Sequence, residues 1–217
     1  EREQREVSRR RRRARLRGEP GRLTDVTEKA GLAGVAALAA VAGDYDNDGL
    51  PDLLVSGPAG VSLLHNEGGG RFKAEAVPVA AWPHPAATAT FVDIDHDGDL
   101  DAFVAAAAPD GPGLLLRNNG DRTFADVTAA AQLGGAGGAV AIVPTDFDNR
   151  RDVDLLVLKR DRPVLFKNAR DGSFKDLAAE LGLVATGPFA SAAAADVNKD
   201  GYTDFFLGGQ GASSLAL

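Results

Sequence analysis

Aspartates recur at alternate positions of the segment 44–52, and their spacing is that of a cation site. Carboxylates occupy positions 1, 3, 5 and 9 of this segment: Asp44, Asp46, Asp48 and Asp52. A hard cation such as Ca²⁺ binds six to eight oxygens, and alternate side chains of a curled loop can converge on one point. Gly49, at position 6, permits the sharp turn, and Leu50 would add its backbone carbonyl as a further ligand.

These nine residues also resemble the beginning of an EF-hand loop. An EF-hand needs a bidentate glutamate at its twelfth position, where this chain has Val55. The residues after the loop, Leu53–Val55, form a short apolar run that favours a buried strand over a helix. We therefore interpret the segment as a cation-binding loop between strands.

The aspartate pattern returns three more times. The loops begin at Asp44, Asp93, Asp146 and Asp196, in steps of 49, 53 and 50 residues. The candidate ligands of the second loop are Asp93, Asp95, Asp97 and Asp101, with the carbonyl of Asp99. Those of the fourth loop are Asp196, Asn198, Asp200 and Asp204, with the carbonyl of Tyr202. We predict about three Ca²⁺ sites that act as structural staples.

The third loop, Asp146–Asp154, departs from the pattern. Arg150 stands at position 5, and Arg151 replaces the glycine at position 6. A guanidinium group beside the remaining carboxylates would take the place of the cation by pairing with Asp146 and Asp148. We predict an internal ion pair in this loop and no calcium.

Further residues recur in phase with the loops and define a repeat of about 50 residues. An asparagine stands six residues before a phenylalanine in three units: Asn66 and Phe72, Asn118 and Phe124, Asn168 and Phe174. Each unit parses into four short strands, and tandem four-stranded units of this length are typical of β-propeller blades. We predict an all-β, partial propeller over residues 21–217, with blades at about 33–77, 86–128, 138–178 and 189–217 and a lone outer strand at 22–27.

Alanine-rich runs precede each loop, and read alone they favour helix. They are 36–40, 86–91, 139–143 and 191–195. Each run is too short for a stable helix and leads directly into a loop, so we predict that they are innermost strands, where small side chains fit near a propeller axis. Segments 27–32, 128–133 and 176–183 are expected to form helical turns between blades.

With these motifs in view, the chain resembles the FG-GAP/VCBS repeat family of calcium-binding β-propellers. The phrases Phe-x-Asp-Val-Thr and Ala-Gly-Leu are similar to its cartilage-acidic-protein-like branch. The resemblance implies that each loop joins the two innermost strands of a blade. It also implies an exported module, extracellular, periplasmic or on the cell surface, that serves adhesion, recognition or scaffolding.

Charge divides the chain into two parts. Residues 1–20 form an arm with nine Arg and four Glu, a net charge of +5. Because the whole chain carries −7, residues 21–217 carry −12. This acidic remainder argues against nucleic acid as its partner. The arm is expected to be a solvated tail or linker, or else to bind an anionic polymer or membrane surface. No apolar run approaches the ~20 residues of a membrane span, and without Cys the chain has no disulfide or thiolate site.

The sequence shows no catalytic constellation. The three histidines, His65, His84 and His96, lie in different repeat phases, and no nucleophile elbow or phosphate-binding loop is found. The stretch Ala81–Pro85 holds the only Trp and could be a recognition loop or a packed plug between blades.

Three functions remain open from the sequence, of which the third is an intracellular scaffold whose Arg-rich arm binds an anionic polymer. The first is a noncatalytic, calcium-stabilised propeller module that binds a protein or glycan. The second is an accessory propeller domain of a larger exported enzyme whose active site lies outside this chain. The lone strand at 22–27 could close a four-bladed ring by pairing with the fourth blade, or the remaining blades could belong to a longer parent chain with about seven.

Overall fold

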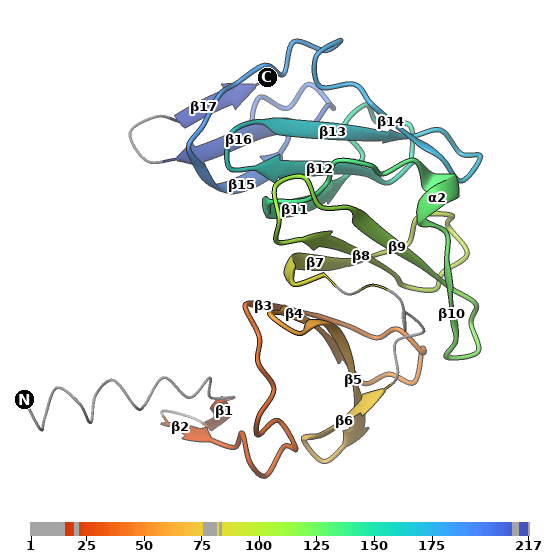
Figure 1. The fold of residues 1–217 in the computed structure, drawn as a ribbon, viewed down its shortest axis with the longest axis vertical. Helices are drawn as coiled ribbons and strands as arrows, with labels where there is room; N and C mark the ends of the chain where they lie inside the picture. Colours follow the sequence, from red (N-terminus) through yellow and green to blue (C-terminus); the bar gives the residue numbers. More distant parts are fainter. Residues whose placement is uncertain (1–15, 20–21, 76–81, 83, 210–212, 217) are drawn as a thin grey trace, which may run out of the picture.

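Four antiparallel sheets stand side by side in an arc, as Figure 1 shows. The computed structural model describes residues 16–19, 22–75, 82, 84–209 and 213–216. Each sheet is one predicted blade, and its strands follow the order of the chain. The arc is open, so the fold is all-β and that of a partial propeller, as predicted.

The strands run from the concave side of the arc to its rim. Blade 1 consists of β3 (Ala39–Gly43), β4 (Asp52–Gly57), β5 (Gly60–Gly68) and β6 (Arg71–Glu75). Blade 2 consists of β7 (Ala86–Val92), β8 (Asp101–Ala106), β9 (Gly113–Asn118) and β10 (Phe124–Asp126). Blade 3 consists of β11 (Ala139–Thr145), β12 (Asp154–Lys159), β13 (Pro163–Asn168) and β14 (Phe174–Asp176). Blade 4 consists of β15 (Phe189–Ala195), β16 (Asp204–Gly209) and β17 (Ser213–Ala216).

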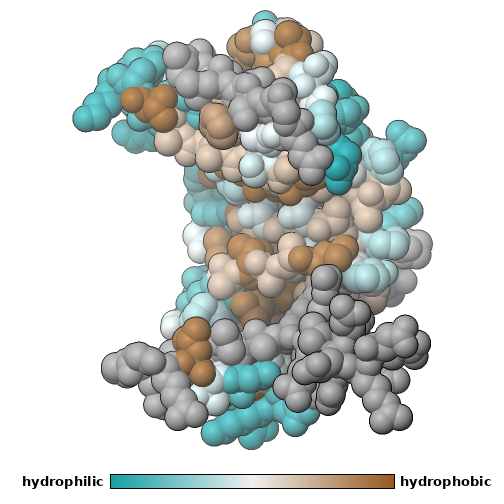
Figure 2. Space-filling view, turned by 90° about the vertical axis from the view of Figure 1, so that its left-hand side faces the viewer, coloured by the Kyte–Doolittle hydropathy of each residue, from teal (hydrophilic) through white to brown (hydrophobic). Residues whose placement is uncertain are grey.

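The alanine-rich runs are inner strands, which confirms the periodic interpretation over helix propensity. The neighbouring inner strands β3, β7, β11 and β15 contact one another in that order. Small side chains allow this approach: a Cβ added at Gly43 would lie 2.7 Å from the ring of Phe91 in the next blade. Figure 2 faces this concave side and shows small and apolar side chains between hydrophilic ends.

Apolar clusters between successive sheets hold the blades together. The third residue of each second strand points to the following blade, and Leu54, Phe103 and Leu156 at this position are 1%, 0% and 0% exposed. The equivalent Phe206 of blade 4 is 48% exposed, because no sheet follows it in the described residues. Burying an aromatic or leucine side chain contributes roughly 1.5–3 kcal/mol, so these positions are principal blade-to-blade contacts.

The segment before blade 1 differs from the predicted lone strand. β2 (Arg22–Asp25) pairs antiparallel with β1 (Leu16–Glu19), which lies inside the predicted arm, and the intervening Pro20-Gly21 is a typical turn sequence. In the described residues β17 pairs with β16 alone, so β2 does not close a four-bladed ring here. Residues 1–15 of the arm lie outside the described residues.

The segments before blade 1, between blades 2 and 3, and between blades 3 and 4 each contain a turn. Residues 27–31 and 178–182 form turns, and α2 (Thr128–Ala131) is a single helical turn, in line with the predicted segments. Trp82 is half-buried and packs against the cluster between blades 1 and 2, although Ala81 and Pro83 lie outside the described residues. No helix in the part of the chain that the structure describes is long and apolar enough to cross a membrane.

Candidate metal centres

The four aspartate loops connect the first and second strands of the four sheets, and all four share one backbone conformation. The residue at position 6 adopts a positive φ in each: Gly49 at 86°, Gly98 at 93°, Arg151 at 67° and Gly201 at 92°. Arg151 thus keeps the turn without glycine, at the cost of the strain that an L side chain meets in this region.

The aspartate at position 9 of each loop is buried and accepts hydrogen bonds from the backbone. Asp52, Asp101 and Asp154 are 0% exposed, and one oxygen of each accepts the backbone N–H of the repeat asparagine at 2.7–2.8 Å. In loop two the other oxygen of Asp101 accepts the N–H of Ile94 at 2.9 Å. Burial raises the pKa of Asp101 to about 7 and that of Asp154 to about 6, and it also raises the pKa of Asp52.

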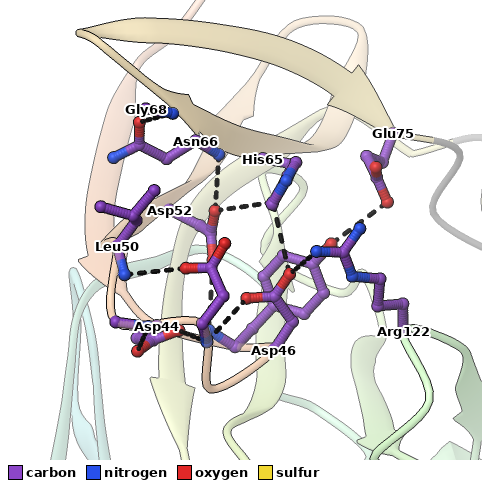
Figure 3. A network of polar contacts seen from close by, with 12 residues as sticks. Asp44, Asp46, Leu50, Asp52, His65, Asn66, Gly68, Glu75 and Arg122 are labelled. Carbon is purple, nitrogen blue, oxygen red and sulfur yellow. Dashed lines mark hydrogen bonds and ion pairs between the residues drawn. The ribbon is translucent and has the colours of Figure 1, made fainter.

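Loop one brings three predicted ligands together but already holds basic groups. Ligand atoms of Asp44, Asp46 and Asp52 lie within 4.8 Å of one another. His65 Nδ1 lies 3.2 Å from Asp52 Oδ1 and 3.4 Å from Asp46 Oδ2, and Arg122 of the next blade places Nη2 2.5 Å from Asp46 Oδ2. Figure 3 shows both basic side chains directed at these carboxylates. The remaining ligands, Asp48 and Leu50, are exposed at the loop surface.

Loop two brings three carboxylates together without a basic partner. Ligand atoms of Asp93, Asp95 and Asp101 lie within 4.8 Å of one another. Asp93 Oδ1 is buried and has no hydrogen-bond partner, whereas its Oδ2 accepts the N–H of Gly98 at 3.2 Å. Among the described residues no ion pair reaches this group. Asp97 is not part of this carboxylate group, and its Oδ1 accepts the N–H of Asp99. The side-chain Oδ1 of Asp99 in turn accepts a hydrogen bond from Asn47 Nδ2 of loop one at 2.7 Å.

Loop three holds an internal ion pair, but its partners differ from the prediction. Arg150 Nε lies 3.3 Å from Asp148 Oδ2, and Lys167 Nζ makes a closer contact with the same oxygen. The expected pairing with Asp146 is wrong, because both of its oxygens accept the backbone N–H groups of Arg150 and Arg151 at 2.9 and 2.8 Å. The backbone therefore satisfies Asp146, and the lysine supplies most of the positive charge.

Loop four keeps the turn but does not gather its side chains into a comparable group in the described residues. Asn198 Nδ2 donates to Asp200 Oδ2 at 3.0 Å, and Asp196 accepts the N–H groups of Asp200 and Gly201 at 3.1 and 3.0 Å. Asp204 is buried and accepts the N–H of Val197, and Tyr202 is 57% exposed. The amide of Asn198 thus donates where a carboxylate would accept.

The basic residues in the loops were not foreseen from the sequence, although a signal exists. The residue directly before each repeat asparagine is basic: His65, Arg117 and Lys167. The first and third point into their own loops, and Arg117 is exposed. Ligand atoms of Asp146, Asp148 and Asp154 in loop three also lie within 4.8 Å of one another, although Lys167 and Arg150 pair with Asp148. Of these three clustered loops, loop two fits a divalent cation best, because it offers a buried carboxylate oxygen with no partner and no competing cation.

Hydrogen bonds between blades join the loops into a continuous edge. Asn118 Nδ2 donates to the carbonyl of Tyr45 at 2.7 Å, and Asn168 Nδ2 donates to the carbonyl of Ile94 at 2.9 Å. At the next junction Thr203 Oγ1 donates to the carbonyl of Asp146 at 3.2 Å. Loops one, two and three are therefore each held by the blade that follows.

Comparison with protein families matches FG-GAP-like repeats at residues 44–104, 93–157 and 146–207. The chain belongs to the FG-GAP-like repeat family. The matched spans each run from one aspartate loop through the next, which agrees with the repeat and the sheets described above. No curated protein matches the chain.

Among solved structures, the chain is similar to a lectin from Agrocybe aegerita that specifically recognises non-reducing terminal N-acetylglucosamine. The TM-score is 0.54 at 20% identity, over 87% of this chain and 52% of the lectin, so this FG-GAP chain spans about half the lectin's length. A Photorhabdus luminescens Tc holotoxin pore matches with a TM-score of 0.42 and 21% identity, over 81% of this chain and 8% of that one. The lectin supports the fold.

Proposed function

We propose that this chain is a noncatalytic, calcium-stabilised propeller module that binds a protein or glycan ligand outside the cytoplasm. The observation that carries the calcium part is the group Asp93, Asp95 and Asp101, with its buried and unpartnered oxygen. The fold likeness to a glycan-recognising lectin supports the binding part. The cartilage-acidic-protein-like branch is also part of this proposal and rests on the phrases Phe-x-Asp-Val-Thr and Ala-Gly-Leu of the sequence.

The three aspartate loops that keep the ligand pattern would bind calcium unequally. In loop two the side chains of Asp93, Asp95, Asp97 and Asp101, with the carbonyl of Asp99, would hold the ion. In loop one the ion would have to displace Arg122 from Asp46, and in loop four Asn198 would have to turn its oxygen inward. Bound calcium would neutralise charge and link the second blade's two inner strands.

Calcium titration tests this proposal directly. With a dissociation constant of ~10⁻⁴ M, typical of extracellular calcium modules, 1–10 mM Ca²⁺ would stabilise the fold by about 1.4–2.7 kcal/mol per site. Isothermal titration should give binding, and chelator should lower the melting temperature. Absence of a heat of binding at millimolar calcium, together with an unchanged melting temperature, would refute the calcium part.

A second candidate is that the chain is an accessory domain of a larger exported enzyme. The chain spans about half of the lectin, which leaves room for further parts in a parent protein. Turnover assays on the parent protein, compared with ligand binding by this chain alone, separate the two functions. Binding by this chain without any effect on turnover favours the first, and turnover that depends on this chain for substrate capture favours the second.

A further inference from the structure

A groove of about 490 Å³ lies between blades 2 and 3, beside loop two. Its apolar wall includes Ile94, Val127 and Phe174, and three arginines line it: Arg117, Arg151 and Arg170. The volume falls in the range of small-molecule sites, which pair apolar walls with a few polar groups.

The groove is open because two bulky side chains of the preceding junction are replaced. Between blades 1 and 2, Tyr45 is 1% exposed and packs against Phe124 with ring centroids 5.7 Å apart, and Arg122 closes over Asp46. At the same repeat positions between blades 2 and 3 the chain has Ile94 for the tyrosine and Gly172 for the arginine. The smaller Ile94 and Gly172 leave space there, while Arg170, at the repeat position of Gly120, lines that space.

Two of the three guanidinium groups in the groove are unengaged. Arg170 pairs with Asp152 and donates to the carbonyl of Arg150 at 2.5 Å. The guanidinium groups of Arg117 and Arg151 make no hydrogen bond or ion pair within the described residues, and both residues are exposed; Arg151 bonds Asp146 only through its backbone N–H. Arg117 is the exception among the basic residues that precede the repeat asparagines, since His65 and Lys167 are turned into their own loops.

The carboxylates that line the groove are already engaged or are candidate calcium ligands. Asp152 is 4% exposed and holds Arg170, and Asp171 accepts the N–H and Oγ–H of Ser173 at 2.9 and 2.6 Å. Asp95 belongs to the loop-two group. Once a cation balances Asp95, the two free arginines leave the groove with a net positive charge.

We propose that this groove binds a small acidic sugar through its carboxylate. A guanidinium matches a planar carboxylate with two parallel hydrogen bonds, and Arg117 and Arg151 approach from opposite blades. The apolar wall suits the C–H face of a sugar ring, and the volume suits a mono- or disaccharide. This inference rests on the proposed binding function and names its ligand class.

An NMR titration with glucuronic acid tests the proposal, with glucose as the neutral control, both in millimolar calcium. Glucuronic acid should bind at least ten-fold more tightly than glucose, with shifts at residues that line the groove. Arg117→Gln and Arg151→Gln should each weaken it about ten-fold, since each removes charge-assisted hydrogen bonds. Arg162→Gln is the matched control, because Arg162 is exposed in the turn between β12 and β13, at the opposite end of the strands.

A third variant, Gly172→Arg, restores the arrangement of the preceding junction and should block the groove. Arg122 adopts a φ of 68° at this repeat position, and nothing lies within 4 Å of a Cβ added at Gly172, so the variant is expected to fold. Equal affinity for glucose and glucuronic acid, no binding of either, or affinity unchanged by both glutamine variants would overturn the proposal. Tighter binding of a glutamate-containing tripeptide would overturn the sugar assignment.

The proposed function and this inference fail separately. Binding of neutral glycans alone would refute the acidic-sugar site but not the proposal that the chain is a binding module. Glucuronic acid binding without any calcium response would refute calcium stabilisation but not the acidic-sugar site in the groove.

Discussion

The side chain of Asn118 should be among the most important single polar groups for cohesion between blades. It is 1% exposed, and its Nδ2 donates to the carbonyl of Tyr45 at 2.7 Å and to that of Leu100 at 3.2 Å. Its Oδ1 accepts the N–H of Gly120 at 3.1 Å. Asn118→Ala removes three hydrogen bonds and leaves the carbonyl of the buried Tyr45 without this partner at the junction of blades 1 and 2, whereas Leu100 is half-buried and Gly120 is exposed.

A net hydrogen bond contributes about 1 kcal/mol, and an orphaned buried group costs more, so we expect Asn118→Ala to lower the free energy of unfolding by about 3 kcal/mol. Asn119→Ala is the matched control, because this exposed neighbour bonds only Thr123 through its side chain, at 2.9 Å, and should cost under about 0.5 kcal/mol. Asn66→Ala should fall between them, since its Nδ2 donates only to Pro51 of its own blade.

Urea unfolding followed by the fluorescence of Trp82 and by circular dichroism measures these differences. Trp82 is the only Trp of the chain and packs at the same junction as Asn118. Its transition should therefore move with Asn118→Ala even if blades unfold separately, as repeat proteins can. If Asn118→Ala and Asn119→Ala lay within 0.5 kcal/mol of each other by both probes, the idea that asparagine bonds hold the blades together would be refuted.

Three further predictions follow from the loops. Asp93→Asn should remove calcium binding from loop two in a titration, whereas Asp148→Ala should leave the calcium stoichiometry unchanged, because Lys167 and Arg150 already pair with that carboxylate. In calcium-free protein the pKa of Asp101 is about 7 in the folded state and near 3.8 in the unfolded state, so the folded state keeps this proton to a higher pH. The stability that the protonated Asp101 contributes is therefore lost as pH rises from about 4 to 7. Denaturation midpoints should fall over this interval, and Asp101→Asn should flatten the fall. Arg122→Gln frees Asp46 and should lower the melting temperature in chelator but increase the gain on adding calcium, and an unchanged gain would contradict a competing role for this arginine.

The fold followed from the sequence because its signals repeat. A single alanine-rich run such as 36–40 favours helix, yet four runs in phase with loops indicate inner strands, and β3, β7, β11 and β15 are those strands. The pairing of β1 with β2 was missed because it occurs once, so no repeat supported a strand at 16–19.

The site was predicted less completely, since spacing within one loop says nothing about side chains that arrive from elsewhere. Arg122 reaches Asp46 from the next blade, and Lys167 reaches Asp148 from two strands away. The packing of sheets places Arg122, and strand pairing within blade 3 places Lys167, so the sequence assigned the positive charge of loop three to the arginines of the loop itself and missed the lysine. The aspartate at position 9 was predicted as a ligand, but its two backbone hydrogen bonds in loop two also make it part of the framework.

This framework role implies that the loops form before any ion arrives. Position-1 and position-9 aspartates accept backbone N–H groups of their own loop and neighbouring strand, so carboxylate charge is partly balanced by peptide dipoles. Loops one and three add basic side chains to that balance, whereas in loop two the buried Asp93 Oδ1 has neither a hydrogen-bond partner nor a basic side chain beside its group. Calcium would therefore bind a preformed loop, and its effect should be a graded gain in stability concentrated at blade 2. A chain that unfolded completely in chelator at 25 °C would show that this balance is insufficient and that the ion is part of the fold itself.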